Sequence, residues 1–226
     1  MNILVIAAHP DDEVLGCGGT IARFADEGAS ISILILANGL TSRSDFDAAK
    51  EQEQLGVHHG RARLATKLLG AKEVNIAGFP DQKMDALPLL DITQAIEREV
   101  ARVRPEIVFT QHGGDLNMDH VITFRATMTA TRPVAGNSIR KLYAYEIPSS
   151  TEWAFKQFSP PFEPNVFMEI EGSLEKKIQA MQIYESEARA FPHPRSPEIL
   201  RATAQRWGSH VGLRAAEAFE CVWEIR

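Results

Sequence analysis

A polar cluster near the start of the chain has the composition of a cation site. The segment His9-Pro10-Asp11-Asp12-Glu13 brings an imidazole and three carboxylates into five residues, and such carboxylates repel one another unless a cation is present. Imidazole nitrogen and carboxylate oxygen are ligands that suit a zinc-type ion. A catalytic zinc takes three protein ligands and leaves one position for water. His9 and one of the aspartates can therefore supply two of the three ligands.

A second polar segment, residues 112–120, can complete this site. It ends in His120, which is placed to supply the third ligand. Adjacent residues in a turn point in different directions, so one of Asp11 and Asp12 can bind the metal while the other faces the attacking water. Zinc lowers the pKa of bound water to about 7, and the second carboxylate can accept the proton as general base. The residue chemistry alone does not choose between Asp11 and Asp12 for these two roles.

The elements that must position these residues alternate along the first half of the chain. Apolar runs rich in Ile and Val predict strands buried on both faces, at residues 2–8, 30–36, 72–77 and 106–111. Apolar residues at helical spacing predict helices between them, at residues 16–28, 45–69 and 89–103. This alternation is typical of βαβ units and predicts an α/β fold with a mainly parallel sheet.

A polar loop follows each of these four strands. Because ligands bind outside the carboxyl ends of the strands in open parallel sheets, we expect the four loops to meet at one edge. The second loop carries Arg43, which either holds a sugar hydroxyl or phosphate or is a solvated loop charge. The third carries Asp81, which is a candidate for substrate binding and also fits a common Pro-Asp turn.

The second half of the chain is less regular. Strands are predicted at residues 140–147, 165–170 and 218–225, and helices at residues 174–188 and 197–208. A proline-rich segment, residues 159–164, separates the first two of these strands. Since no repeat, low-complexity tract or clear linker interrupts the chain, we expect a single domain over residues 1–226.

Composition excludes several classes of protein. The 226 residues are 44% hydrophobic and 24% charged and include two cysteines, which excludes disordered, collagen-like and disulfide-scaffold proteins. The formal net charge is -6 and no basic run exceeds Lys176-Lys177, so nucleic acid is not an expected partner. No run approaches the roughly 20 apolar residues of a membrane span. The stretch 3–8 is too short for a signal peptide, so we expect a cytoplasmic protein.

Several motifs together resemble one known family. AHPDDE at residues 8–13 follows the first strand and precedes the pair Gly18-Gly19, and DLNMDH stands at residues 115–120. GFPDQKMD, PHPRSPE and GSHVGLRAAEAFE occupy residues 78–85, 192–198 and 208–220. These segments resemble the PIG-L/LmbE-like family of zinc-dependent N-acetylglucosaminyl deacetylases, and the similarity spans nearly the whole chain.

The resemblance implies a fold, a reaction and a set of roles. It implies a Rossmann-like, three-layer fold and removal of acetyl from an N-acetylated amino sugar or sugar conjugate, a small-molecule substrate. Carried over residue by residue, it assigns His9, Asp12 and His120 to zinc or another divalent metal. It assigns Asp11 to the general base.

One departure from the family concerns the proton that the leaving amine needs. Several relatives have a histidine where this chain has Asn117, which can donate a hydrogen bond to the substrate but cannot act as an acid. The protonating role would then move to His193, with His112 as the second candidate. Asp119 would hold Asn117 or His120 in place of the missing histidine.

Three alternatives stay open at the level of sequence, of which one is a metal-binding relative that has lost turnover, which Asn117 makes conceivable. An amidase acting on a thiol-sugar conjugate or another small amide would use the same metal site. A non-catalytic sugar- or nucleotide-binding module is the rival of a different class, although no G-x-G-x-x-G follows any predicted strand. A homo-oligomer, in which the proline-rich segment and the loop around His193 reach a neighbouring subunit, is a further hypothesis.

Overall fold

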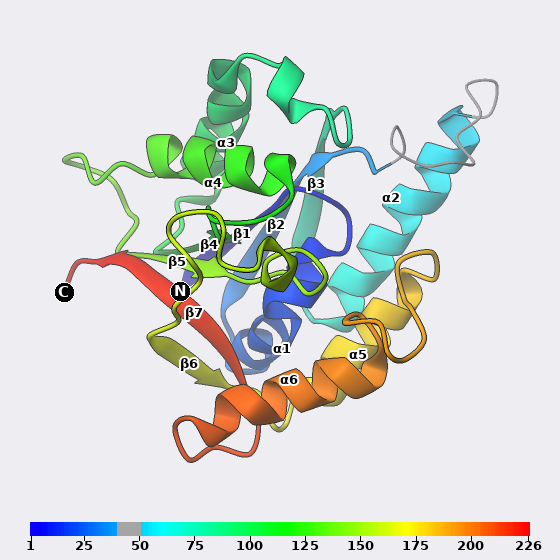
Figure 1. Cartoon of the computed structure of the whole chain (residues 1–226). Coiled ribbons are helices and arrows are strands. Elements are labelled where there is room, and N and C mark those ends of the chain that lie inside the picture. Colours follow the sequence, from blue (N-terminus) through cyan, green and yellow to red (C-terminus); the bar gives the residue numbers. More distant parts are fainter. Residues whose placement is uncertain (40–50) are drawn as a thin grey trace.

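Seven strands form one sheet at the centre of the molecule, in the order β3-β2-β1-β4-β5-β7-β6 (Figure 1). The computed structural model describes residues 1–39 and 51–226. The strands are β1 (Asn2–Ala7), β2 (Ser30–Ala37), β3 (Glu73–Phe79), β4 (Ile107–Gln111), β5 (Lys141–Tyr145), β6 (Val166–Glu169) and β7 (Ala216–Glu224). The first five pair in parallel, and β7 lies antiparallel between β5 and β6. The predicted mainly parallel sheet is confirmed.

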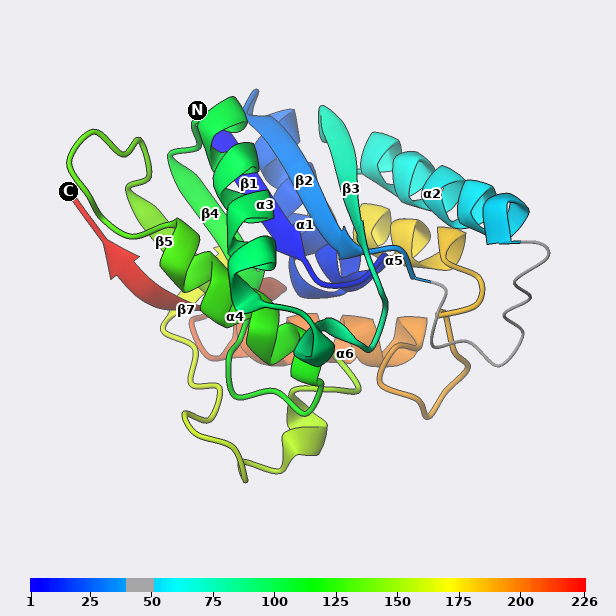
Figure 2. The same cartoon turned by 90° about the horizontal axis from the view of Figure 1, so that it is seen from above.

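Two helical layers cover the sheet. One face packs against α1 (Asp12–Asp26), α2 (Glu51–Leu68), α5 (Leu174–Ile183) and α6 (Pro197–Ser209). The other packs against α3 (Leu89–Val103) and α4 (Met118–Ala130), as the view from above shows (Figure 2). Two 3-10 turns, η2 (Met84–Ala86) and η3 (Glu152–Ala154), lie in loops. Among the described residues, no helix is long and apolar enough to cross a membrane.

The central strands are apolar on both sides because both sides are covered. In β1, Ile3 and Val5 pack into the core beneath α1, whereas Leu4 and Ile6 pack into the core beneath α3. This is why the strand reads as a continuous apolar run rather than an alternating one.

Two predicted helix boundaries are wrong. The helix predicted at residues 16–28 begins at Asp12, and the helix predicted at residues 174–188 ends at Ile183. In the second case the backbone leaves helical geometry at Tyr184, whose hydroxyl donates to the buried Glu13 carboxylate. Residues 45–50 of a third predicted helix lie outside the described residues.

The topology predicts a ligand site at the point where the strand order of the sheet reverses. From β1 the order runs outward through β2 to β3, and β4 then returns to the other side of β1. In such sheets the loops after the two strands at the reversal diverge and leave a crevice. The loops after β1 and β4 carry the polar segments 9–13 and 112–120.

A buried ion pair supports a kink in the helix that begins at this crevice. Helix α1 has non-helical angles at Cys17. The Glu217 carboxylate accepts hydrogen bonds from the backbone N–H groups of Gly19 (3.0 Å) and Thr20 (2.7 Å). Lys177 pairs with Glu217 at 2.6 Å and also donates to a carbonyl before the kink. The pair thus supplies the hydrogen bonds that the kink removes from the helix.

Candidate metal centre and active site

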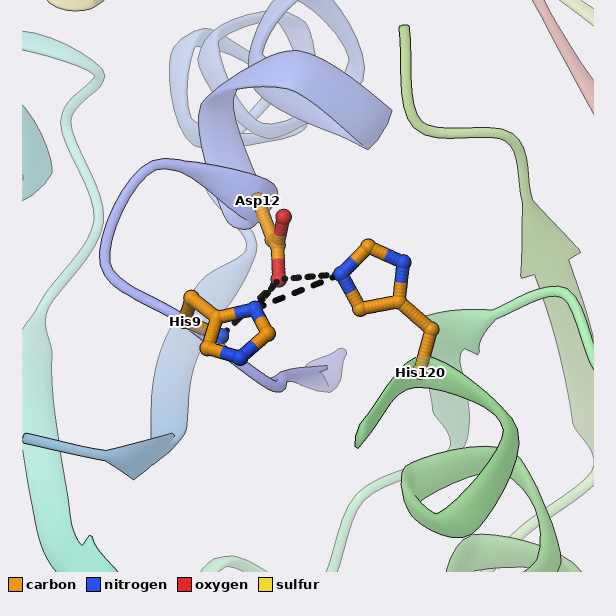
Figure 3. Close-up of side chains that lie close together, drawn as sticks. All are labelled: His9, Asp12 and His120. Carbon is orange, nitrogen blue, oxygen red and sulfur yellow. Dashed lines mark hydrogen bonds and ion pairs between the residues drawn. The ribbon is translucent and has the colours of Figure 1, made fainter. Parts of the chain in front are cut away.

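Three side chains converge on one point in this crevice (Figure 3). His9 follows β1, Asp12 opens α1, and His120 lies in the first turn of α4. His9 Nδ1 and His120 Nε2 each lie 3.3 Å from Asp12 Oδ2, and the two nitrogens lie 3.3 Å from each other. We refer to these three residues as the metal group, since their ligand atoms could hold an ion.

The spacing of the metal group fits a tetrahedral zinc ion. Ligands at the usual zinc distances of about 2.0–2.2 Å lie about 3.3–3.6 Å apart in a tetrahedron. Octahedral magnesium, with ligands at about 2.0–2.1 Å, would bring neighbouring ligands to about 2.8–3.0 Å. The three observed separations of 3.3 Å therefore match the tetrahedral case.

A carboxylate behind each imidazole fixes which nitrogen faces the other ligands. His9 Nε2 lies 3.0 Å from Asp119 Oδ2, and His120 Nδ1 lies 3.1 Å from Asp115 Oδ1. In the neutral rings these nitrogens carry the proton and donate it, which leaves the lone pairs on His9 Nδ1 and His120 Nε2. Carboxylate–histidine pairs of this kind orient metal ligands. The donor set therefore has the chemistry of a metal site.

The partner of Asp119 differs from the expected one. The sequence predicted that Asp119 holds Asn117 or His120, but its Oδ2 faces His9 and accepts the backbone N–H of Gln82 at 2.8 Å. The reason is geometric, because the first turn of α4 directs Asp119 toward the loop after β3. Asp115 supports His120 in its place.

Burial and pairing set the charges of the metal group in the absence of an ion. Burial lowers the pKa of His120, but Asp12 and Asp115 outweigh it and raise the pKa to about 9. Burial also lowers the pKa of His9, which Asp119 and Asp12 raise above its usual value. Burial raises the pKa of Asp12, yet the two histidines hold it well below its usual range. A cation must therefore displace protons when it binds.

Asp11 lies next to the metal group in a strained backbone conformation. Its φ is 121°, a region that non-glycine residues rarely adopt. Its backbone N–H donates to Glu13 Oε2 at 3.1 Å, and the Tyr184 hydroxyl donates to Glu13 Oε1 at 2.6 Å. Burial raises the pKa of Asp11, whereas Arg195 opposes this rise. The turn thus sends Asp12 into the metal group and gives Asp11 a separate environment.

A cavity of about 380 Å³ opens beside these residues. Its wall includes the whole metal group and Asp11, together with two predicted substrate contacts, Asp81 and Asn117. Small-molecule sites of proteins have volumes of about 300–1,000 Å³. The cavity is therefore large enough for a small ligand, and the structure brings six of the eight predicted site residues to it.

Asn117 and Asp81 also have local partners. Asn117 caps α4, because its Oδ1 accepts the Asp119 backbone N–H at 2.9 Å. This leaves Nδ2 as the donor end of the side chain. Asp81 Oδ1 lies 3.2 Å from His9 Nε2, so Asp81 supports this imidazole as well as lining the cavity. Contact of either residue with substrate stays a prediction.

The two histidines that the sequence suggested as proton donors, His193 and His112, lie outside the cavity wall. His193 Nδ1 accepts the Arg195 backbone N–H at 3.1 Å, and partial burial and nearby arginines lower the pKa of His193. His112 is buried between Glu220 Oε2 and the Pro160 carbonyl, each 2.9 Å from a ring nitrogen. Neither ring belongs to the cavity wall. In the ranges 1–39 and 51–226, the cavity wall beside Asp11 therefore holds no third imidazole.

Arg195 reaches the cavity although the sequence pattern did not single it out. Its Nη1 donates to Asp11 Oδ2 at 2.7 Å. The signal was the segment PHPRS, in which the titratable His193 drew the prediction two residues away. Arg43, the other predicted substrate contact, lies outside the described residues.

A known family matches more than half of the chain. The family described as "PIG-L: GlcNAc-PI de-N-acetylase" matches residues 4–131, a segment that includes the metal group and Asp11. The chain is also 32% identical over 191 residues to the uncharacterized deacetylase YaiS of Escherichia coli (strain K12). That alignment covers 82% of this chain and 91% of the relative.

Two further proteins align with nearly all of the chain. Diacetylchitobiose deacetylase of Thermococcus kodakarensis is 25% identical over 240 residues, covering 98% of this chain and 83% of the relative. The crystal structure of GalB, the 4-carboxy-2-hydroxymuconate hydratase of Pseudomonas putida KT2440, matches with a TM-score of 0.77 at 22% identity. It covers 100% of this chain and 98% of that chain. The second likeness shows that the fold is shared.

Proposed function

The chain belongs to the PIG-L family, and from this premise we propose that it is a zinc-dependent amide hydrolase. Its substrate is an N-acetylglucosamine-type amino sugar or sugar conjugate, from which it removes the N-acetyl group. One observation carries the proposal. His9, Asp12 and His120 place three ligand atoms 3.3 Å apart at the wall of a cavity that Asp11 also lines.

Zinc is the metal that this donor set favours, because two imidazoles and one carboxylate with tetrahedral spacing suit it. When bound, zinc supplies Lewis acidity toward an amide carbonyl and makes water acidic enough to attack near neutral pH. Asp119 and Asp115 keep the two imidazoles oriented. Another divalent metal with a tetrahedral preference would be held by the same residues.

Asp11 is the residue that moves the proton. Its carboxylate lies in the cavity wall, and burial raises its pKa toward the range in which a general base works at neutral pH. Asp11 accepts the proton of the attacking water as the hydroxyl adds to the acetyl carbon. Among the described residues, the only imidazoles in the cavity wall are the two of the metal group, so no further histidine is at hand to protonate the leaving amine. Asp11 therefore also returns the proton to the nitrogen as the C–N bond breaks, which yields acetate and the free amine.

The residues predicted for substrate binding contact the substrate in this proposal. Asn117 Nδ2 donates to an oxygen of the substrate, and Asp81 accepts from a sugar hydroxyl. Both residues line the cavity. Arg43 keeps its predicted role at a hydroxyl or phosphate, whereas His193, which does not line the cavity, is given no part in this mechanism. The relative from Thermococcus kodakarensis, named a diacetylchitobiose deacetylase, supports an amino-sugar substrate.

The reaction follows from the site and not from the fold. The same fold occurs in a protein named as a hydratase, and a fold alone does not determine function. A non-catalytic binding module would have no use for a strained, buried carboxylate beside a metal group. An amidase on a thiol-sugar conjugate or another small amide would use the same residues.

Product analysis with a panel of amides tests the proposal. Chelator-stripped and zinc-reloaded protein is incubated with N-acetylglucosamine, diacetylchitobiose, a thiol-sugar amide and a simple N-alkyl acetamide. We expect equal amounts of acetate and free amine from an N-acetylated amino sugar, and only with zinc. Turnover of the other amides alone would favour the amidase. Zinc-loaded protein that releases nothing from any amide would contradict the proposal.

We also propose three further properties of this protein. The chain forms one domain over residues 1–226, and the protein is cytoplasmic. It also forms a homo-oligomer in which a neighbouring subunit reaches the cavity mouth. Light scattering that shows a fully active monomer would exclude the last of these.

A further inference from the structure

Arg195 contacts the carboxylate that the proposed reaction uses as its base. Its Nη1 donates to Asp11 Oδ2 at 2.7 Å. The side chain of Arg195 is 18% exposed and that of Asp11 is 4% exposed. A short bond between ionised groups that is shielded from water is stronger than an ion pair at the surface. The contact therefore constrains the orientation of the Asp11 carboxylate.

Other contacts fix the guanidinium itself. Arg195 Nε donates to Ser149 Oγ at 2.8 Å, and Nη1 lies 3.3 Å from Glu187 Oε2. Ser149 precedes η3, and Glu187 lies in the turns after α5, so the guanidinium joins two loops to the start of α1. A side chain held from several directions is preorganised, since it does not reorient when a substrate enters.

The backbone at Arg195 is equally constrained. Ser196 is the N-cap of α6, with its Oγ accepting the Ile199 N–H at 3.3 Å, and Pro197 occupies the first turn. The Ser196 N–H donates to the His193 carbonyl at 2.9 Å. Arg195 therefore extends from the fixed beginning of a helix rather than from a free loop.

Asp11 is held from two independent sides. Glu13 binds its backbone N–H and supports the positive φ, while Arg195 binds Oδ2 of its side chain. The second carboxylate oxygen, Oδ1, accepts no hydrogen bond from any residue in the described ranges. One oxygen is thus anchored, and the other is available to the cavity that Asp11 lines.

We propose that Arg195 is a positioning residue for the hydrolysis, which anchors Asp11 Oδ2 so that Oδ1 faces the attacking water. This inference rests on the proposed function. A misplacement of about 1 Å in an active site can lower the rate about 100-fold. Arg195→Ala should therefore lower kcat about 100-fold. KM and zinc affinity should stay close to wild type, because Arg195 donates to none of the metal group.

Steady-state kinetics with chemical rescue tests the role. Arg195→Ala and Arg195→Lys are compared with wild type, and Arg201→Ala is the control. Arg201 lies on the same helix and pairs with the exposed Glu175 at 2.7 Å. We expect added methylguanidinium to restore part of kcat in Arg195→Ala but not in Arg195→Lys, where a lysine fills the space. An unchanged kcat, or a raised KM with unchanged kcat, would overturn the inference. The inference would also be overturned if kcat fell only together with Tm and methylguanidinium did not restore it.

Crystal structures of the zinc-loaded wild type and Arg195→Ala provide a readout that needs no turnover. We expect the Asp11 carboxylate to leave its wild-type rotamer in the variant. Where Arg195→Ala does not fold, Arg195→Lys serves the same comparison. An unchanged Asp11 would overturn the inference. Wild-type protein that releases no acetate would contradict the proposed function instead, and the orientation of Asp11 would still decide the role of Arg195.

Discussion

Asp11 and Asp12 are neighbours in the chain and are both buried, but they differ in their partners and in the direction of their pKa shifts. Asp12 lies 3.3 Å from both imidazoles, which hold its pKa well below the usual range. Asp11 sits at a φ of 121°, and burial raises its pKa. In the proposed mechanism, the backbone turn therefore gives the ligand role to Asp12 and the proton-transfer role to Asp11.

Asp11→Asn should separate these two roles. The amide keeps the size of the side chain but cannot accept a proton, so kcat should fall about 10²–10⁴-fold. Zinc should still bind one to one, because Asp11 is not one of the three residues of the metal group. Acetate release and zinc content are measured together, with Asp85→Asn as the exposed carboxylate control. A fully active Asp11→Asn would show that the base is another residue.

Zinc affinity should rise with pH. The pKa of His120 is about 9 without an ion, so at pH 7 the ring is protonated and zinc must displace that proton. Affinity should fall as the pH drops below 9, by up to about tenfold per pH unit for each displaced proton. Titrations at pH 6, 7 and 8 in buffers of different ionisation enthalpy measure both quantities. An affinity that is independent of pH would contradict the charge state described here.

Residue chemistry pointed to His9, His120 and one of the two aspartates, and the family resemblance selected Asp12, but neither predicted Asp115 or Arg195 as supporting residues. His9, Asp12 and His120 follow strands of a parallel sheet, so their convergence is a consequence of topology. Asp115 and Arg195 act through the direction of a side chain in an irregular loop. Nothing in the sequence pattern specifies that direction, since it depends on contacts with distant segments.

At the scale of elements, the crevice between the ends of β1 and β4 creates the site. Helices α1 and α4 both begin there, and their first turns carry Asp12 and His120. The start of α1 is strained at Asp11 and its middle is kinked at Cys17. The buried pair of Lys177 and Glu217 holds the two halves of this helix together.

Removing one partner of this buried pair should destabilise the protein strongly. Lys177→Met leaves the Glu217 charge buried and unpaired, which should cost about 3–5 kcal/mol of unfolding free energy. Adding Glu217→Gln should recover part of this loss, because no isolated charge remains. Urea unfolding of the single and double variants measures the coupling.

The adjacent lysine provides the control for this prediction. Lys176 pairs with Asp26 at 2.8 Å on the surface, where its side chain is 40% exposed. Lys176→Met should change the unfolding free energy by less than about 1 kcal/mol. Equal losses in Lys176→Met and Lys177→Met would show that the buried pair has no special role.

The elements themselves were predictable wherever local sequence determines them. The four strands of the first half and the helix at residues 89–103 agree closely with the structure, because apolar periodicity reflects burial between two layers. The end of α5 at Ile183 was not predictable. Tyr184, the residue at which the helix ends, bonds Glu13, which is 171 residues away in sequence, and local periodicity carries no information about such a contact.

At the scale of the whole molecule, the site joins distant parts of the chain. The metal group comes from residues 9–120, whereas Arg195 and Tyr184, from the second half, bond the neighbouring carboxylates of Asp11 and Glu13. If the chain forms the single domain proposed above, binding of an ion to this site should stabilise the entire fold and not only a loop.

Zinc should accordingly raise the unfolding free energy of the whole chain. At a free zinc concentration of 100 times Kd, mass action gives about 2.7 kcal/mol. Unfolding should remain one transition that shifts with zinc in wild type but not in His120→Ala. Calorimetric scans with and without zinc measure this. Two separate transitions, only one of which shifts, would contradict a single domain.

Zinc titration of the stripped protein, with wild type beside His120→Ala, tests the central claim most directly. We expect one-to-one binding in wild type and a collapse of affinity in the variant, because one of the three ligand atoms is lost. Equal affinity in the two proteins would contradict a metal site formed by His9, Asp12 and His120, since the metal would then bind without His120.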